Sequence, residues 1–152
     1  RGVSAWVDVP GLVDTDQLAR SGVDLARLFV LRPGRPTDAL GIAAQLISSG
    51  NFSVVVLDAL ADMAPGAETA TAIGQFVRMV VPALGRTTTV ALVLSAPEQR
   101  FRALAHAAAL RIALVKVGLI RQGGVLRGWR TQASVLKSPG LQGGESGFEI
   151  WL

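Results

Sequence analysis

Asp58 ends a short apolar run, and it is the polar residue of this chain that we single out as a candidate for chemistry. The run 3–7 ends at Asp8, and the run 54–57 ends at Asp58. An apolar run followed by Asp occurs in many α/β proteins, and in its simplest role the carboxylate caps the turn after a strand. His106, the only histidine, is surrounded by alanines, with no cysteine or second histidine nearby. A single histidine of this kind is more often a packed or surface residue than a ligand.

The sequence contains no phosphate-binding loop of the Gly-x-x-x-x-Gly-Lys-Ser/Thr type. Such a loop cradles phosphates with successive backbone N–H groups while its lysine reaches them. The only lysines are Lys116 and Lys137, and neither follows a glycine. Cysteine is absent, so disulfides and thiolate metal sites are excluded. We also find no nucleophile–base pair and no cluster of metal-ligating residue types.

The elements that would position these residues alternate between strand and helix over the first two thirds of the chain. Strands are expected at 3–7, 28–31, 54–57 and 88–94, and helices at 15–20, 37–49 and 69–84. Asp14 is predicted to cap the first helix, and Gly50 ends the second. The strands are apolar enough to be buried on both faces, as in a parallel sheet covered by helices. Pro82 is expected to disturb the last turn of the third helix.

The pattern changes after Leu110. Extended segments are expected at 110–120, 125–136 and 148–152, and glycine-rich turns separate them. Such turns indicate antiparallel hairpins. We therefore predict an α/β fold, a doubly wound and mostly parallel sheet with a C-terminal antiparallel hairpin extension, in a single domain over residues 1–152.

The composition limits the class of protein. Half of the residues are hydrophobic, 17% are charged, and the mean hydropathy is positive. Charged residues nevertheless interrupt the long apolar runs, so no membrane-spanning segment is expected. No signal peptide is recognised either. These features fit a cytoplasmic protein.

The charge is distributed unevenly along the chain. Residues 1–75 carry five Arg against seven Asp and one Glu, a net charge of −3, whereas residues 76–152 carry eight Arg and two Lys against three Glu, a net charge of +7. A basic second half could attract a polyanion such as DNA. A scattered set of solvated arginines explains the same charge equally well.

Three stretches together resemble bacterial RecA, the strand-exchange recombinase. The first contains Ala5 to Asp8, Asp14, Gly22 to Leu25, Pro33, Ala39-Leu40, Ser49-Gly50, Val54 to Asp58, Pro65, Glu68 and Gly74. The second is Leu92 to Ser95, and the third contains Ala103-Leu104, Leu110 to Ile112, Gly118, Gly123, Gly128, Thr131 and Lys137. No single motif is decisive, so the order of these residues along nearly the whole chain carries the resemblance.

The resemblance implies roles for three residues. Asp58 matches the Walker B aspartate, which would hold Mg²⁺ through water beside the β- and γ-phosphates of ATP. Asp14 matches a candidate adenine contact. Lys137 matches a lysine that reaches the nucleotide of the neighbouring subunit in a filament. Its companion position is Pro139 here, and an exposed lysine at a strand end explains Lys137 equally well.

The chain departs from the RecA pattern at positions that serve ATP hydrolysis. The catalytic glutamate falls on Pro10, the γ-phosphate-sensing glutamine on Ala96, its asparagine neighbour on Ser95 and the adenine-stacking aromatic on Gln17. The sequence also begins where the family's second strand begins, so that a phosphate-binding loop either lies upstream of Arg1 or has been lost. ATP and Mg²⁺ are therefore expected only if such an upstream loop exists.

The DNA-binding part of the family pattern is also reduced. RecA has two mobile loops in the interval that Pro97 to Phe101 fill here. Two explanations stay open, namely that the loops are deleted or that they are left out of the sequence as given. Arg100 and Arg102 are the candidate DNA-binding residues of this interval.

We expect a RecA-like protein of DNA repair, recombination and the SOS response to DNA damage. It would act as a non-catalytic binding and interaction module, similar to the degenerate ImuA-type relatives that accompany translesion polymerases. It would be cytoplasmic, bind a protein partner and bind DNA weakly; a homo-oligomer and association with the nucleoid are compatible with this. The alternative is a fragment of an active DNA-dependent ATPase recombinase, and a third hypothesis is an unrelated α/β interaction domain.

Overall fold

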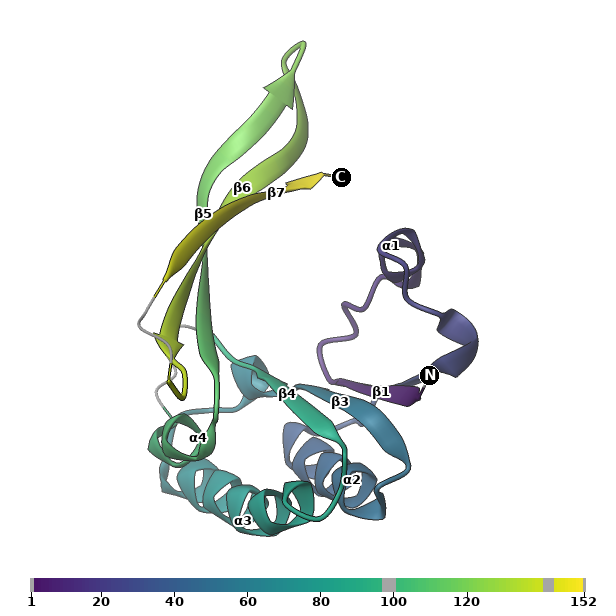
Figure 1. Cartoon of the computed structure of the whole chain (residues 1–152), viewed down its shortest axis with the longest axis vertical. Coiled ribbons are helices and arrows are strands. Elements are labelled where there is room, and N and C mark those ends of the chain that lie inside the picture. Colours follow the sequence, from purple (N-terminus) through teal and green to yellow (C-terminus); the bar gives the residue numbers. More distant parts are fainter. Residues whose placement is uncertain (1, 97–100, 141–143, 152) are drawn as a thin grey trace. The chain divides into compact units, whose positions relative to one another are not determined.

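The computed structural model describes residues 2–96, 101–140 and 144–151. The chain divides into two compact units, residues 1–104 and residues 105–152, which are described separately (Figure 1). The first unit combines a parallel sheet with helices, and the second contains an antiparallel sheet. The predicted α/β class with a C-terminal antiparallel extension is therefore confirmed. That the two units form a single domain stays a prediction.

The sheet of the first unit is parallel throughout. Its strands, in spatial order, are β2 (Leu28–Leu31), β1 (Val3–Asp8), β3 (Phe52–Asp58) and β4 (Val90–Leu94). Since all four strands run in the same direction, their carboxyl ends share one edge of the sheet. Asp8 and Asp58 end the two central strands at this edge.

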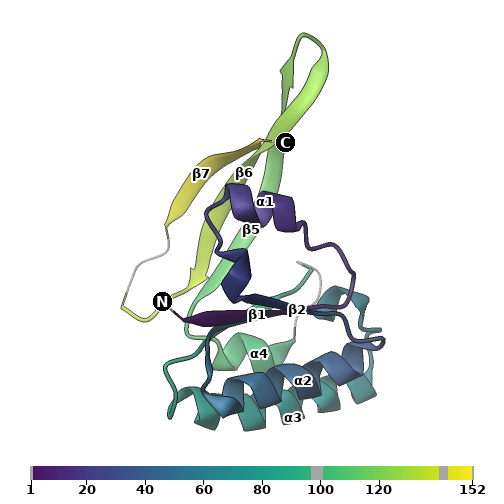
Figure 2. The ribbon, with the colours of Figure 1, turned by 90° about the vertical axis from the view of Figure 1, so that its right-hand side faces the viewer.

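Two long helices lie side by side along one face of the sheet, as both views show (Figures 1 and 2). They are α2 (Pro36–Ser49) and α3 (Ala67–Leu84). The buried residues of α2 are Ala39, Leu40, Ala43, Ala44 and Ile47, and those of α3 are Ile73, Phe76, Val80 and Ala83. These residues recur every three or four positions, which is the spacing of one helix face. They pack with Val7, Val55 and Leu57 of the sheet to form the core.

Gly50 ends α2 in the left-handed conformation, with φ of 68°. A residue with a Cβ is strained there, which is why glycine so often follows the last turn of a helix. Pro82 lies inside α3 and does not end it, because the helix continues to Leu84 and the Gly85 N–H still donates to the Val81 carbonyl.

A short helix, α1 (Thr15–Arg20), lies on the side of the sheet opposite α2 and α3, as both views show (Figures 1 and 2), and none of its residues is buried. Asp14 caps it as predicted, since its Oδ1 accepts a hydrogen bond from the Gln17 N–H at 3.0 Å. The remaining short helices are η1 (Leu25–Arg27), η2 (Leu60–Asp62) and α4 (Arg102–Ala107).

The prediction that the fourth strand is buried is wrong. β4 begins at Val90 rather than at residue 88, and it pairs with β3 alone, at the edge of the sheet. Its alternate side chains Val90, Leu92 and Leu94 are 53%, 48% and 42% exposed. The strand is apolar on both faces, but only the face toward the helices is covered.

The second unit is a three-stranded antiparallel sheet in the order β5-β6-β7. Its strands are β5 (Arg111–Gln122), β6 (Val125–Lys137) and β7 (Glu145–Trp151). Gly123 and Gly124 form the two-residue turn between the first two strands, with φ of 58° and 82°. Positive φ at both central positions is the geometry of a type I′ turn, which glycine adopts without strain.

Within the residues that the structure describes, no helix is long and apolar enough to cross a membrane.

Candidate functional site

Asp8 and Asp58 lie next to each other at the carboxyl edge of the parallel sheet. The two residues are register partners at the ends of β1 and β3. The Val9 N–H donates to the Asp58 carbonyl oxygen at 3.0 Å, which extends the pairing one residue beyond the strand. In open α/β sheets this edge is where ligands bind. The structure thus places Asp8 beside Asp58, the aspartate that the sequence singled out.

The carboxylate of Asp8 is fully buried and already engaged. Its Oδ1 accepts from the Leu12 N–H at 3.0 Å, and its Oδ2 accepts from the Val13 N–H at 3.2 Å and from Arg32 Nε at 3.0 Å. A buried carboxylate needs such partners, because an unpaired charge inside a protein is costly. Asp8 therefore fixes the loop that follows β1, and Arg32 provides its countercharge.

Arg32 is a site residue that sequence reasoning missed. It directly follows β2, the neighbour of β1, so parallel pairing brings it to the same edge as Asp8. The signal in the sequence was that Arg32 directly follows the apolar run 28–31, just as Asp8 directly follows the apolar run 3–7. Without the strand order, that arginine could not be assigned a partner.

Asp58 differs from Asp8 in being partly exposed. Burial raises the pKa of its carboxyl group above the usual 3.8, and the neighbouring charges of Asp8 and Asp62 raise it further. Three acidic groups near one another would favour a bound cation, which would stabilise the charged form. Across the described residues, however, no group of three or more His, Cys, Asp or Glu side chains is arranged to hold a metal ion. The Mg²⁺ role of Asp58 stays a prediction.

The positions that depart from the catalytic pattern lie at the same edge. Pro10 is in the loop after β1, and Ser95 and Ala96 directly follow β4. Proline has no group that could accept a proton from water. Gln17 and Asp14 lie farther along, at the start of α1, where Asp14 acts as the helix cap. The adenine-contact role of Asp14 stays a prediction.

Lys137 has a local role in the second unit. Its Nζ donates to the carbonyl oxygens of His106, at 2.7 Å, and of Ala105, at 3.4 Å. These are carbonyls of the last turn of α4, which a cationic side chain commonly caps. The role of Lys137 toward a neighbouring subunit's nucleotide is untested, and this cap accounts for the residue within its own chain.

One of the two candidate DNA-binding arginines lies within the described residues. Arg102 begins α4, and it is exposed. Arg100 lies outside the described residues. A DNA contact by either side chain stays a prediction.

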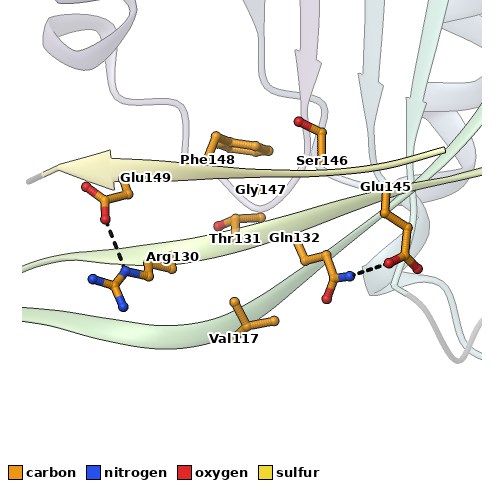
Figure 3. Close-up of a pocket in the computed structure, with 9 residues that line it drawn as sticks. All are labelled: Val117, Arg130, Thr131, Gln132, Glu145, Ser146, Gly147, Phe148 and Glu149. Atoms are coloured by element: carbon orange, nitrogen blue, oxygen red, sulfur yellow. Dashed lines mark hydrogen bonds and ion pairs between the residues drawn. The ribbon is translucent and has the colours of Figure 1, made fainter.

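A shallow hollow on the second unit was not expected from the sequence. It has a volume of about 480 Å³ and lies against β6 and β7, between two polar pairs that Figure 3 shows. Arg130 Nε pairs with Glu149 Oε1 at 3.1 Å, and Gln132 Nε2 donates to Glu145 Oε2 at 2.8 Å. Gly147 stands opposite Gln132 in the strand pairing and leaves the gap between the pairs without a side chain. The polar groups of these four side chains pair with one another, and the hollow is open to solvent.

The fold and the edge geometry define an open parallel α/β domain with its candidate site at the carboxyl ends of the central strands. The family model of the RecA N-terminal domain matches residues 1–98, which is more than half of the chain. The chain belongs to the RecA family.

Curated relatives give the same family. A protein RecA of Paenarthrobacter aurescens is 26% identical over 162 residues, which cover 90% of this chain and 74% of the relative. A protein RecA of Acidothermus cellulolyticus is 27% identical, with coverage of 90% and 47%. The chain spans about half the length of most of the relatives it matches. Because an alignment over 162 residues exceeds the 152 residues of this chain, the relatives contain segments without a counterpart here.

Proposed function

We propose that this RecA-family chain is a non-catalytic accessory protein of DNA repair, of the kind that supports damage-induced mutagenesis and translesion synthesis. It would act in the cytoplasm, at or near the nucleoid, by binding a protein partner and, weakly, DNA. Function on a common fold resides in the site rather than in the fold itself. The family membership therefore leaves open which activity the site supports.

One observation carries the proposal, namely the loop that follows β1. The position of the catalytic base is Pro10, and the only carboxylate at this end of the strand, Asp8, is buried against Arg32 and two backbone N–H groups. A general base must reach the proton it abstracts, and a fully engaged buried carboxylate is poorly suited to do so.

The second candidate function is that of an active ATPase recombinase whose phosphate-binding loop lies outside these residues. Asp58 favours it, since the Walker B position is retained at the partly exposed end of β3. The two candidates make different predictions for the same assay.

Phosphate release in the presence of Mg²⁺, ATP and single-stranded DNA separates them. We expect no sustained turnover, because loss of a general base alone costs about two to four orders of magnitude in rate. The matched controls are Asp58→Ala and Asp38→Ala, the latter on the exposed first turn of α2. A sustained rate that Asp58→Ala abolishes and Asp38→Ala preserves would favour the active ATPase. The sequence upstream of Arg1 in the gene provides an independent check.

DNA binding is expected to be electrostatic and insensitive to base sequence. The second unit supports this, because its cations Arg111, Lys116, Arg121, Arg127, Arg130 and Lys137 outnumber its two acids, Glu145 and Glu149. Each phosphate neutralised should contribute about −0.7 to the slope of log K against log salt for single strands. Fluorescence anisotropy with two oligonucleotides of equal length and different sequence measures both properties. Binding that is independent of salt, or strongly selective for one oligonucleotide, would contradict this part of the proposal.

A protein partner is expected at β7, which forms one edge of the second sheet. Phe148 and Trp151 are 42% and 54% exposed on this strand, and exposed aromatic side chains are common in protein interfaces. Removing residues 148–152 should weaken capture of a translesion-synthesis partner more than it lowers the melting temperature. The matched control is the double variant Leu12→Ala/Leu25→Ala, which removes exposed apolar groups from the first unit. Equal losses of capture would exclude β7 as the specific surface.

A further inference from the structure

We draw no further inference here: the strongest candidate, the open hollow of about 480 Å³ beside Gly147 on β6 and β7, carries nothing because the polar side chains around it pair with one another and no described residue indicates what would occupy it.

Discussion

Arg32 donates from Nε to the buried carboxylate of Asp8 across 3.0 Å, and this ion pair joins the ends of two adjacent strands. Asp8 is fully buried, whereas the arginine side chain is 56% exposed. The pair therefore combines a desolvated acceptor with a donor that water still reaches. It occupies the edge of the sheet at which an α/β protein of this type would bind a ligand.

Removing the arginine should destabilise the fold. Arg32→Ala leaves the buried Asp8 carboxylate with two backbone N–H groups and no countercharge, and we expect a loss of about 1–3 kcal/mol in the free energy of unfolding. Arg35→Ala is the control, because its ion pair with Asp38 is exposed and should contribute less than about 1 kcal/mol. Urea denaturation of both variants measures the difference. Equal losses in the free energy of unfolding would mean that the buried pair of Asp8 with Arg32 stabilises the fold no more than an exposed pair does.

Stability should depend on the ionisation of Asp58. Because the folded-state pKa of this group is raised above 3.8, the folded protein binds more protons than the unfolded chain in the pH range just above that value. The free energy of unfolding therefore falls as the pH rises through the folded-state pKa. Asp58→Asn should raise the melting temperature at pH 7, and the gain should shrink as the pH approaches 3.8.

Thermal melting of Asp58→Asn at pH 7 and at acidic pH makes the comparison. Gln45→Asn, at an exposed position of α2 that carries no titratable group, is the control and should show no such dependence. A gain for Asp58→Asn that is the same at both pH values would contradict the electrostatic explanation.

Gly128 should not tolerate alanine. A Cβ at this position of β6 would overlap the carbonyl oxygen of Ile150 on the paired strand β7. We expect Gly128→Ala to destabilise the second unit by about 1–3 kcal/mol through overpacking. Gly118→Ala is the control, since a Cβ there meets no atom within 4 Å. Hydrogen exchange of the β6 and β7 amides localises the effect, and unchanged protection in Gly128→Ala would contradict the prediction.

Lys137 should contribute to stability without any nucleotide present. Lys137→Met removes the donor to the Ala105 and His106 carbonyls, and the expected loss is about 0.5–1.5 kcal/mol. Arg127→Met, an exposed position on the same strand, should change stability by less than about 0.5 kcal/mol. Denaturation without ATP measures both. If Lys137→Met leaves the free energy of unfolding unchanged without nucleotide, the cap contributes little to the stability of the fold.

Local patterns predicted most of the elements. The alternation of strands and helices, the Asp14 cap and the Gly50 helix end were confirmed, because each depends on neighbouring residues alone. The two-residue turn at Gly123-Gly124 was likewise signalled by its glycines. Asp58 could be recognised as a candidate site residue for the same reason, since the end of an apolar run is visible along the chain.

The relationships between distant residues could not be read in this way. The pairing of Asp8 with Arg32 depends on β1 and β2 being neighbours. The raised pKa of Asp58 depends on the burial of its carboxyl group and then on the charge of Asp8, which lies beside it because β3 pairs with β1. The exposure of Val90, Leu92 and Leu94 depends on which face of the sheet the helices cover, although the composition of β4 alone indicates a buried strand.

The sequence by itself thus determined the α/β class, the positions of most helices and strands, and the absence of a Gly-x-x-x-x-Gly-Lys-Ser/Thr loop from these residues. Periodicity, capping and motif spacing can be recognised because they are properties of contiguous segments of the chain. Only the tertiary structure decided that the Asp8 carboxylate is hydrogen-bonded by groups of its own chain while Asp58 stays partly exposed. Strand order places these groups beside one another, and burial then decides which of two carboxylates, alike in sequence, remains accessible to a ligand.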